Sequence, residues 1–293
     1  MDTLDAFDTC GDANEGYKKR KALFALSREV DAIGYMHSDL FNQDRYLLSG
    51  VDVRLKFIRG RDSFCLMSDT LTSGKLKIND LSLHVRRVEL NPSVALAHAE
   101  ALQLSTARYP ITRVDVKVMT IPSGVQSKSL DSVYTGQLPK RVTLAFVENK
   151  AFNGDLKRNP FYFKPFNLTS LSLVKNGKQI PTRPIECDFS NNGQHMMGYQ
   201  TLLSESGIYF LNTDIGISRE QYPKGYTVFI FDLSPDLSAN CGTHWQLKET
   251  GVLAVEVRFS VALTETLNCI IYAEFDNLIE ISKEREISVD YAC

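Results

Sequence analysis

LAVEVRFSV, residues 253–261, alternates apolar and polar side chains along its whole length. Side chains of a strand point alternately to its two faces, so this pattern predicts a strand with one buried face and one solvated face. A second alternating stretch, LNCIIYAEF at 267–275, follows the short connection 262–266. Connections of this length commonly join neighbouring antiparallel strands, and we therefore expect the two stretches to pair as a hairpin.

The stretch YTVFIF at 226–231 is apolar on both faces, which is typical of a strand covered on both sides. The turn-forming residues SPDLS at 234–238 end this strand, and a long polar connection leads on to 253–261. A strand, a long connection and further strands make a Greek-key pattern. The C-terminal part of the chain therefore predicts an antiparallel β-sandwich.

The first third of the chain also carries strand patterns. VDVRLKF at 51–57 alternates, and shorter and longer strands are expected at 63–67 and 76–90, the latter with a bulge where its apolar phase shifts. Asn91-Pro92 is a strong helix-start signal, because Asn caps helices and Pro suits the first helical position. An alanine-rich helix is expected from there to about Leu104, and it separates two β-rich regions.

In the second half, Asn176-Gly177 is the dipeptide most typical of a two-residue hairpin. Long connections rich in turn formers are expected at 122–136, 148–166 and 182–224, and we expect these loops to carry contacts between subunits. Further strands are expected at 114–118, 138–147 and 169–174, with a short helix at 194–205.

Composition limits the class of protein. A chain of 293 residues is long enough for one large or two ordinary domains, and 43% hydrophobic with 23% charged residues is typical of a globular protein. The net charge of −2 argues against a general nucleic-acid binder. No apolar run approaches the ~18 residues of a membrane-spanning helix. The acidic start MDTLD lacks the apolar core of a secretory signal.

The six cysteines are spaced singly, without a Cys-x-x-Cys pair, which argues against a zinc ribbon. In a chain without a secretory signal the thiols are expected to be reduced. Cys65 and Cys269 stand in apolar strand contexts, so we expect both to behave as small buried hydrophobic residues.

No constellation of catalytic or metal-binding residues is visible. The histidines are too far apart in sequence for a local metal pair, and the chain lacks both a Gly-x-Ser-x-Gly elbow and a phosphate loop. The acidic pair Asp214 and Glu220 is expected to serve the surface rather than catalysis. We therefore predict no catalytic, cofactor-binding or metal-binding residues, no cofactor and no enzymatic activity. The histidines are His37, His84, His98, His195 and His244.

Three features have alternative interpretations. The aromatic stretch NPFYFKPF at 159–166 could stack on sugars or bases, but aromatic residues buried under a loop are commoner. The basic cluster KKRK at 18–21 could serve nuclear import or a phosphate contact, but a solvated charge run is favoured. Trp245, the single tryptophan, is expected to be a packing or interface anchor.

Several irregular segments, in order, resemble one protein family. GYTVFIFDLSP at 225–235, His244-Trp245 with the strand to Phe259, and IYAEFDNLI at 271–279 look like the closing strands of double-jelly-roll major capsid proteins. The resemblance is strongest to the capsid proteins of Polinton (Maverick) transposable elements and adintoviruses, whose genes often occur in animal genomes as uncharacterized ones. It runs from about Lys18 to Tyr291, nearly the whole chain.

The resemblance implies an all-β fold of two adjacent antiparallel jelly rolls. Residues 1–90 would be a partial first jelly roll without its opening strands, 91–107 the connecting helix, and 108–293 the second jelly roll. An incomplete jelly roll would expose sheet edges and apolar faces, which a partner would have to cover unless the copy is decayed.

The resemblance also implies a structural function. Members of the family form pseudo-hexagonal homotrimers that tile an icosahedral shell, together with a penton-type minor capsid protein, and so would be found in the virion. Sequence-specific nucleic-acid binding and a membrane span are not expected, and a chain that does not assemble would be intracellular, in the cytoplasm or nucleus. The alternative is a cellular β-sandwich binding module without catalytic activity, for example for carbohydrate, that uses the aromatic residues at 159–166.

Overall fold

The computed structural model describes residues 10–11, 13–70, 73–190, 193–241 and 247–290, so His244 and Trp245 lie outside the described residues. The strands are β1 (Ala107–Ile121), β2 (Ser127–Gln137), β3 (Arg141–Glu148), β4 (Leu168–Lys175), β5 (Lys178–Glu186), β6 (Val228–Asp232), β7 (Thr250–Phe259), β8 (Leu267–Ile281) and β9 (Ile287–Val289). The helices are α1 (Glu15–Leu23), α2 (Asp62–Cys65), α3 (Pro92–Leu104), α4 (Asn149–Asn153) and α5 (Met196–Ser204), and the 3-10 turns are η2 (Ala25–Ser27), η3 (Asp39–Phe41) and η4 (Ile208–Phe210).

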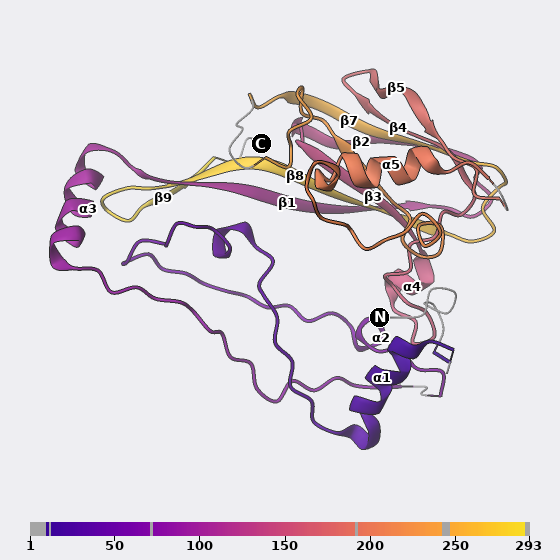
Figure 1. The fold of residues 1–293 in the computed structure, drawn as a ribbon, viewed down its shortest axis with the longest axis horizontal. Helices are drawn as coiled ribbons and strands as arrows, with labels where there is room; N and C mark the ends of the chain where they lie inside the picture. Colours follow the sequence, from indigo (N-terminus) through magenta and orange to yellow (C-terminus); the bar gives the residue numbers. More distant parts are fainter. Residues whose placement is uncertain (1–9, 12, 71–72, 191–192, 242–246, 291–293) are drawn as a thin grey trace.

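The strands beyond α3 form a jelly roll (Figure 1). One sheet has the order β1-β8-β3-β6, with β9 added to β8, and the other has the order β2-β7-β4-β5. All pairings are antiparallel. Two packed four-stranded antiparallel sheets with this Greek-key order are the jelly-roll arrangement. The prediction of an all-β antiparallel sandwich is therefore confirmed.

The core lies between the two sheets and confirms both alternating stretches. In β7 the inward side chains from Leu253 to Phe259 are at most 2% exposed, whereas Glu256 and Arg258 face solvent. In β8 the residues Leu267, Cys269, Ile271, Ala273 and Phe275 are also at most 2% exposed. The rings of Phe259 and Phe146 meet edge to face across the core, with centroids 6.1 Å apart.

The predicted hairpin between these two strands is wrong. β7 pairs with β2 and β4, whereas β8 pairs with β1 and β3 in the other sheet. Leu263, in the connection, exchanges hydrogen bonds of 2.7 and 3.0 Å with residues 124–125 instead of closing a turn. The connection is long enough to cross the ~10 Å between packed sheets, so the apolar faces of the two strands meet across the core.

A second correction concerns residues 122–136, predicted as a loop, because β2 occupies Ser127–Gln137. Its register with β7 shifts between Leu130 and Tyr134, which is a bulge. A bulge breaks the period-two pattern of side chains, and here Val133 and Tyr134 are buried side by side. The serine-rich outer face further hides the strand from a search for apolar alternation.

Other local predictions are confirmed. Asn91 Oδ1 accepts a hydrogen bond of 3.1 Å from the Ser93 amide at the start of α3, as its capping position predicts. Asn176 and Gly177, at φ 52° and 77°, join β4 to β5 in a tight hairpin, because such turns need left-handed residues. β6 is covered on both faces, since Ile230 on its outer side packs against Leu202 of α5 and Tyr222.

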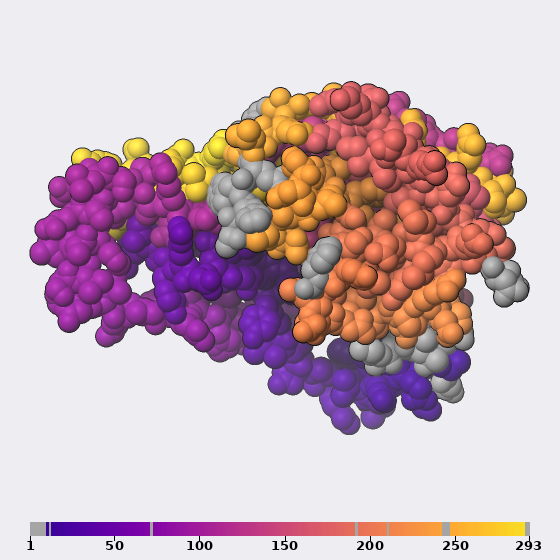
Figure 2. Space-filling model, turned by 45° about the horizontal axis from the view of Figure 1, so that its top comes forward, coloured from indigo at the N-terminus to yellow at the C-terminus, as the bar shows by residue number. Residues whose placement is uncertain are grey.

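The strands predicted at 51–57, 63–67 and 76–90 are not formed. The described residues before 107 contain no strand, and α2 occupies part of 63–67. Figure 2 shows this N-terminal part as a separate layer along one side of the sandwich. An alternating segment needs neighbouring strands to satisfy its backbone and cover its apolar face, and these segments have none among the described residues. In 51–57 and 76–90 most of the large apolar side chains are therefore exposed, from 37% at Leu55 to 67% at Leu81.

Truncation of Phe259 should destabilise the sandwich strongly. The side chain is fully buried, so Phe259→Ala is expected to lower the free energy of unfolding by about 3–5 kcal/mol through lost burial and a residual cavity. Urea unfolding followed by circular dichroism measures this change. Val252→Ala on the same strand, where the side chain is 42% exposed, is the control and should change stability by less than about 1 kcal/mol. Equal losses for the two variants would contradict this account of the core.

Candidate functional site

The histidines and acidic residues considered as candidate ligands or catalytic groups do not come together in one site. His37, His84 and His98 lie on the exposed N-terminal part and α3, and Asp214 and Glu220 are both exposed in a loop. In the described part of the chain there is no group of three or more His, Cys, Asp or Glu side chains that could hold a metal ion. Nor does any helix there have the length and apolar character needed to cross a membrane.

His195 packs as an aromatic ring instead of serving as a ligand. It stacks between Phe189 and Tyr222, at centroid distances of 5.4 and 6.3 Å. Both ring nitrogens are buried without a hydrogen-bond partner among the described residues. The ring therefore belongs to the aromatic layer that holds α5 over the outer face of β6.

Most aromatic residues of the stretch 159–166 are held by contacts with neighbouring segments of the chain. Phe163 exchanges backbone hydrogen bonds with Gly225 and Thr227, at 3.0 and 3.1 Å. Lys164 Nζ donates to Glu148 Oε1 at 2.8 Å and lies 4.9 Å from the ring centre of Tyr162. Phe161 is 59% exposed, and its ring packs edge to face with the ring of Phe64, with the centroids 5.8 Å apart. One exposed ring does not make a stacking platform.

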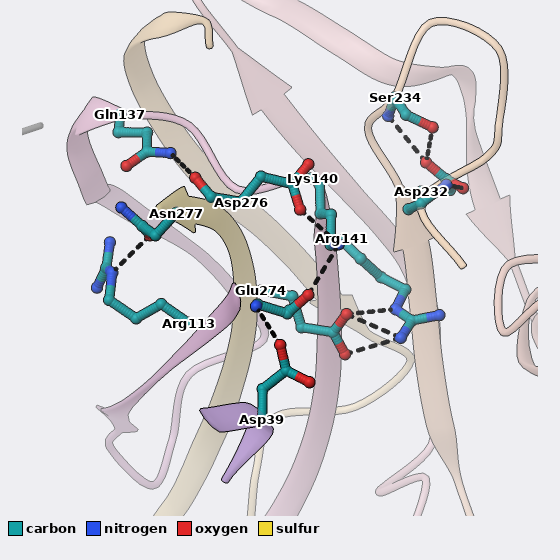
Figure 3. A network of polar contacts seen from close by, with 12 residues as sticks. Asp39, Arg113, Gln137, Lys140, Arg141, Asp232, Ser234, Glu274, Asp276 and Asn277 are labelled. Carbon is teal, nitrogen blue, oxygen red and sulfur yellow. Dashed lines mark hydrogen bonds and ion pairs between the residues drawn. The ribbon is translucent and has the colours of Figure 1, made fainter. Parts of the chain in front are cut away.

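A cluster of polar contacts lies across β1, β8 and β3 of one sheet (Figure 3). Arg141 on β3 and Glu274 on β8 are directly opposite in register and form a bidentate pair, in which Arg141 Nη2 donates to Glu274 Oε1 at 2.8 Å and Nε donates to Oε2 at 3.1 Å. Their side chains are only 20% and 12% exposed. Arg141 Nη1 also donates to Ser206 O at 3.5 Å, which links the strands to the end of α5.

Neighbouring pairs extend this cluster across the sheet. Lys140 Nζ donates to Asp276 Oδ1 at 2.6 Å and to Thr112 Oγ1 at 3.1 Å. On the core-facing side of the same strands, Arg113 Nε donates to Asn277 Oδ1 at 3.2 Å, and its guanidinium lies 4.3 Å from the ring centre of Phe275. Each of these charges has an opposite partner or an aromatic face, so the cluster is a cross-strand clasp rather than a group poised for proton transfer.

Asp232, at the end of β6, organises the turn that follows. Its carboxylate accepts hydrogen bonds from the amides of Ser234 and Ala239, at 2.8 and 3.0 Å, and from the Ser234 hydroxyl. The Asp232 amide in turn donates to Glu205 Oε2 at 3.1 Å. This turn belongs to the segment 225–235 quoted above, but sequence inspection did not single out the clasp residues, because only the register of β3 with β8 shows that Arg141 faces Glu274.

The outer face of the second sheet is hollowed into a groove of about 1030 Å³ with a mixed polar and apolar lining, which includes the exposed Met196 and Met197. Arg258 on β7 lies in register with Ser127 on β2 and Ser170 on β4, and Glu256 lies in register with Ser129 and Ser172. No aromatic side chain lines the groove among the described residues. Without an aromatic ring in the described part of its lining, this groove offers no surface for stacking on sugars.

The cysteines of the described residues differ in burial: Cys65 is exposed, Cys241 is partly buried, and Cys10, Cys187 and Cys269 are buried. Cys269 is buried in the core, as predicted, and burial raises the pKa of its thiol to about 12. Burial likewise raises the pKa of Cys187 to about 11, against a smaller lowering by the hydrogen bond from the Gly198 amide. Cys65 was predicted to be buried, which is wrong, because it lies exposed on α2.

Loss of the clasp should cost much more than loss of a surface ion pair. Glu274→Gln leaves Arg141 half-buried without a counter-charge, and we expect about 3 kcal/mol less stability in urea unfolding at pH 7. Glu280→Gln removes the partner of Arg108, whose side chain is 68% exposed, and should cost at most about 1 kcal/mol. Similar losses for the two variants would show that the clasp contributes no more than a surface pair.

Alkylation should separate the thiols. At pH 8, iodoacetamide is expected to modify Cys65 rapidly and Cys187 and Cys269 only after unfolding in urea, because the latter are inaccessible and their raised pKa values suppress the thiolate. Peptide mass spectrometry at timed intervals measures the order of modification. Rapid labelling of Cys269 in the folded chain would contradict its place in the core.

Comparison with known proteins gives distant similarity. No protein-family model matches the chain. An uncharacterized Caenorhabditis elegans protein, F54H12.2, is 28% identical over 260 residues, which cover 86% of this chain and 61% of that protein. The chain thus spans about three fifths of the length of that relative.

Among solved structures, the chain is similar to that of the Sputnik virophage, at 12% identity and a TM-score of 0.42, over 64% of this chain and 39% of the other. It is also similar to the mavirus major capsid protein, at 10% identity and a TM-score of 0.35, over 64% and 42%. The Faustovirus major capsid protein gives 9% identity and a TM-score of 0.38, over 66% and 36%. TM-scores below 0.5 are too low to establish a shared fold or function.

Proposed function

We propose that this chain is a structural capsid protein of the Polinton and adintovirus type, or an endogenised copy of one. The observation that carries the proposal is where the resembling segments lie: 225–235 contains β6, the stretch ending at Phe259 is β7, and 271–279 lies in β8. These strands occupy both sheets of a jelly roll. The proposal rests on that coincidence of sequence resemblance and strand order, since a fold alone does not define a function.

The geometry suits a wall rather than a reaction site. The two sheets bury one continuous apolar core, and the clasp around Arg141 and Glu274 links β1, β8 and β3 at one level. The connecting loops and the outer face of the β2-β7-β4-β5 sheet remain available for contacts with further copies. In this proposal the chain forms homotrimers that build an icosahedral shell, with a penton-type minor capsid protein as partner, and its location is the virion.

The proposal includes a division of the chain into a partial first jelly roll at 1–90, a connecting helix at 91–107 and a second jelly roll at 108–293. Residues 51–57 and 76–90 support the first part, because they keep the alternation of strands while their apolar side chains stay exposed. Among the described residues, no strand lies beside these segments to pair with their backbone. Strands from a partner or from a further segment would supply this pairing and convert 51–57 and 76–90 into sheet.

Assembly is the test. Purified chain, analysed by light scattering over a concentration series and by electron microscopy, is expected to form trimers of three 33.0 kDa subunits with a pseudo-hexagonal outline. The capsid proposal fails if the chain stays monomeric at every concentration and also binds a glycan on an array, since this result would favour a carbohydrate-binding module. As a matched control, the variant Glu274→Gln tests whether assembly needs an intact sandwich.

A further inference from the structure

β1 is an edge strand whose outer side is largely bare. β8 pairs with it from Ala107 to Ile121, and no described strand pairs with its other side. In an antiparallel pair, alternate residues direct their backbone groups away from the partner strand. Such an edge is a ready template for one more strand, and proteins usually protect it.

Residues 39–46 already protect the first part of this edge. They run antiparallel to β1, and side chains rather than a backbone ladder make most of the contacts. Pro110, which lacks an amide hydrogen, lies on this side, where proline is tolerated in a sheet. The contacts are Arg45 Nη1 to Arg108 O at 2.7 Å, Gln43 Nε2 to Pro110 O at 2.7 Å, and the Thr112 amide to Asp39 Oδ2 at 2.7 Å.

The protection stops at Thr112. The next residues whose backbone groups point toward this edge are Val114, Val116 and Val118. Their side chains lie on the outer face of the sheet and are 43%, 51% and 37% exposed. Tyr272 on β8, opposite Val116 in register, is 39% exposed. The bare edge is therefore flanked by an uncovered apolar row on the outer face of the sheet.

The direction of residues 39–46 identifies the segment that fits. This segment is antiparallel to β1, so the residues that follow it lie toward the N-terminal end of β1. The residues that precede Asp39 can therefore continue along β1 beside Val114, Val116 and Val118. The 3-10 turn η3 lies between the contacts at Gln43 and Asp39 and shifts the register by two residues, so the register beyond it starts from Asp39 and Thr112. Its extension places Tyr35 opposite Val116 and Ile33 opposite Val118. Tyr35 and Ile33 are 85% and 95% exposed where they now lie.

We propose that residues 33–37 close onto β1 as an additional antiparallel strand. Their backbone seals the free edge, and Tyr35 and Ile33 cover the row formed by Val116, Val118 and Tyr272. Aromatic and β-branched side chains are favourable cross-strand neighbours. The contacts at Asp39 tether the segment beside its acceptor, which favours closure within one chain over capture of a strand from another copy.

Cysteine cross-linking tests the register. Directly opposed residues of an antiparallel pair have Cβ atoms close enough for a disulfide after a small adjustment. Under mild oxidation, Tyr35→Cys combined with Val116→Cys is expected to link at least tenfold faster than the out-of-register control, Tyr35→Cys with Thr120→Cys. Peptide mass spectrometry of a mixture of light and heavy chains shows whether the bond lies within one chain. Equal rates, or a bond between chains, would overturn the proposal.

Amide exchange provides a second test without new cysteines. In the unmodified chain the amides of Val114, Val116 and Val118 should be protected, and Ile33→Asp with Tyr35→Asp should increase their exchange at least tenfold. These substitutions lie on exposed side chains, so the sandwich itself is retained. Ile58→Asp, at another exposed apolar residue, is the matched control and should leave the exchange of β1 unchanged. Exchange that does not differ between the double variant and the control would refute closure.

Discussion

The sandwich depends on the contact between the apolar faces of β7 and β8 across the two sheets. Each strand buries every second side chain from Leu253 to Phe259 and from Leu267 to Phe275, and neither strand can do so alone. Because β7 lies between β2 and β4, and β8 lies between β1 and β3, this contact fixes the centre of both sheets. Burial of apolar surface is the main favourable term in folding, so the remaining strands are arranged around these two.

The polar clasp adds what apolar packing does not supply. Hydrophobic burial is non-directional, whereas the bidentate pair of Arg141 and Glu274 exists in one register only. A shift of β3 by one residue against β8 would separate the two charges and turn the apolar residues of β3 to the wrong face. The clasp and the core therefore select the same register of β3 against β8.

Sequence alone was enough where local chemistry and burial agree. Alternation identified the faces of β7 and β8, and Asn176-Gly177 identified a hairpin because that turn requires left-handed backbone. Prediction from the sequence failed where a structural feature depends on residues that are distant in the chain. A short connection does not reveal that β8 crosses to the other sheet, a bulge hides β2, and the pairing of Arg141 with Glu274 follows only from the register.

In the N-terminal third, strand-like sequence patterns do not form strands, because they have no neighbouring strands to pair with in the described part of the chain. Residues 51–57 have the alternation of a strand as clearly as 253–261, yet only the latter are flanked by strands on both sides. An alternating pattern states which face a segment could bury, but the ladder that satisfies its backbone must come from elsewhere. The bare edge of β1 and the exposed apolar side chains before residue 91 are thus two halves of one physical problem, unpaired strand edges and unburied faces. Closure of residues 33–37 would cover a part of these surfaces within the chain, and the apolar side chains at 51–57 and 76–90 would still be exposed.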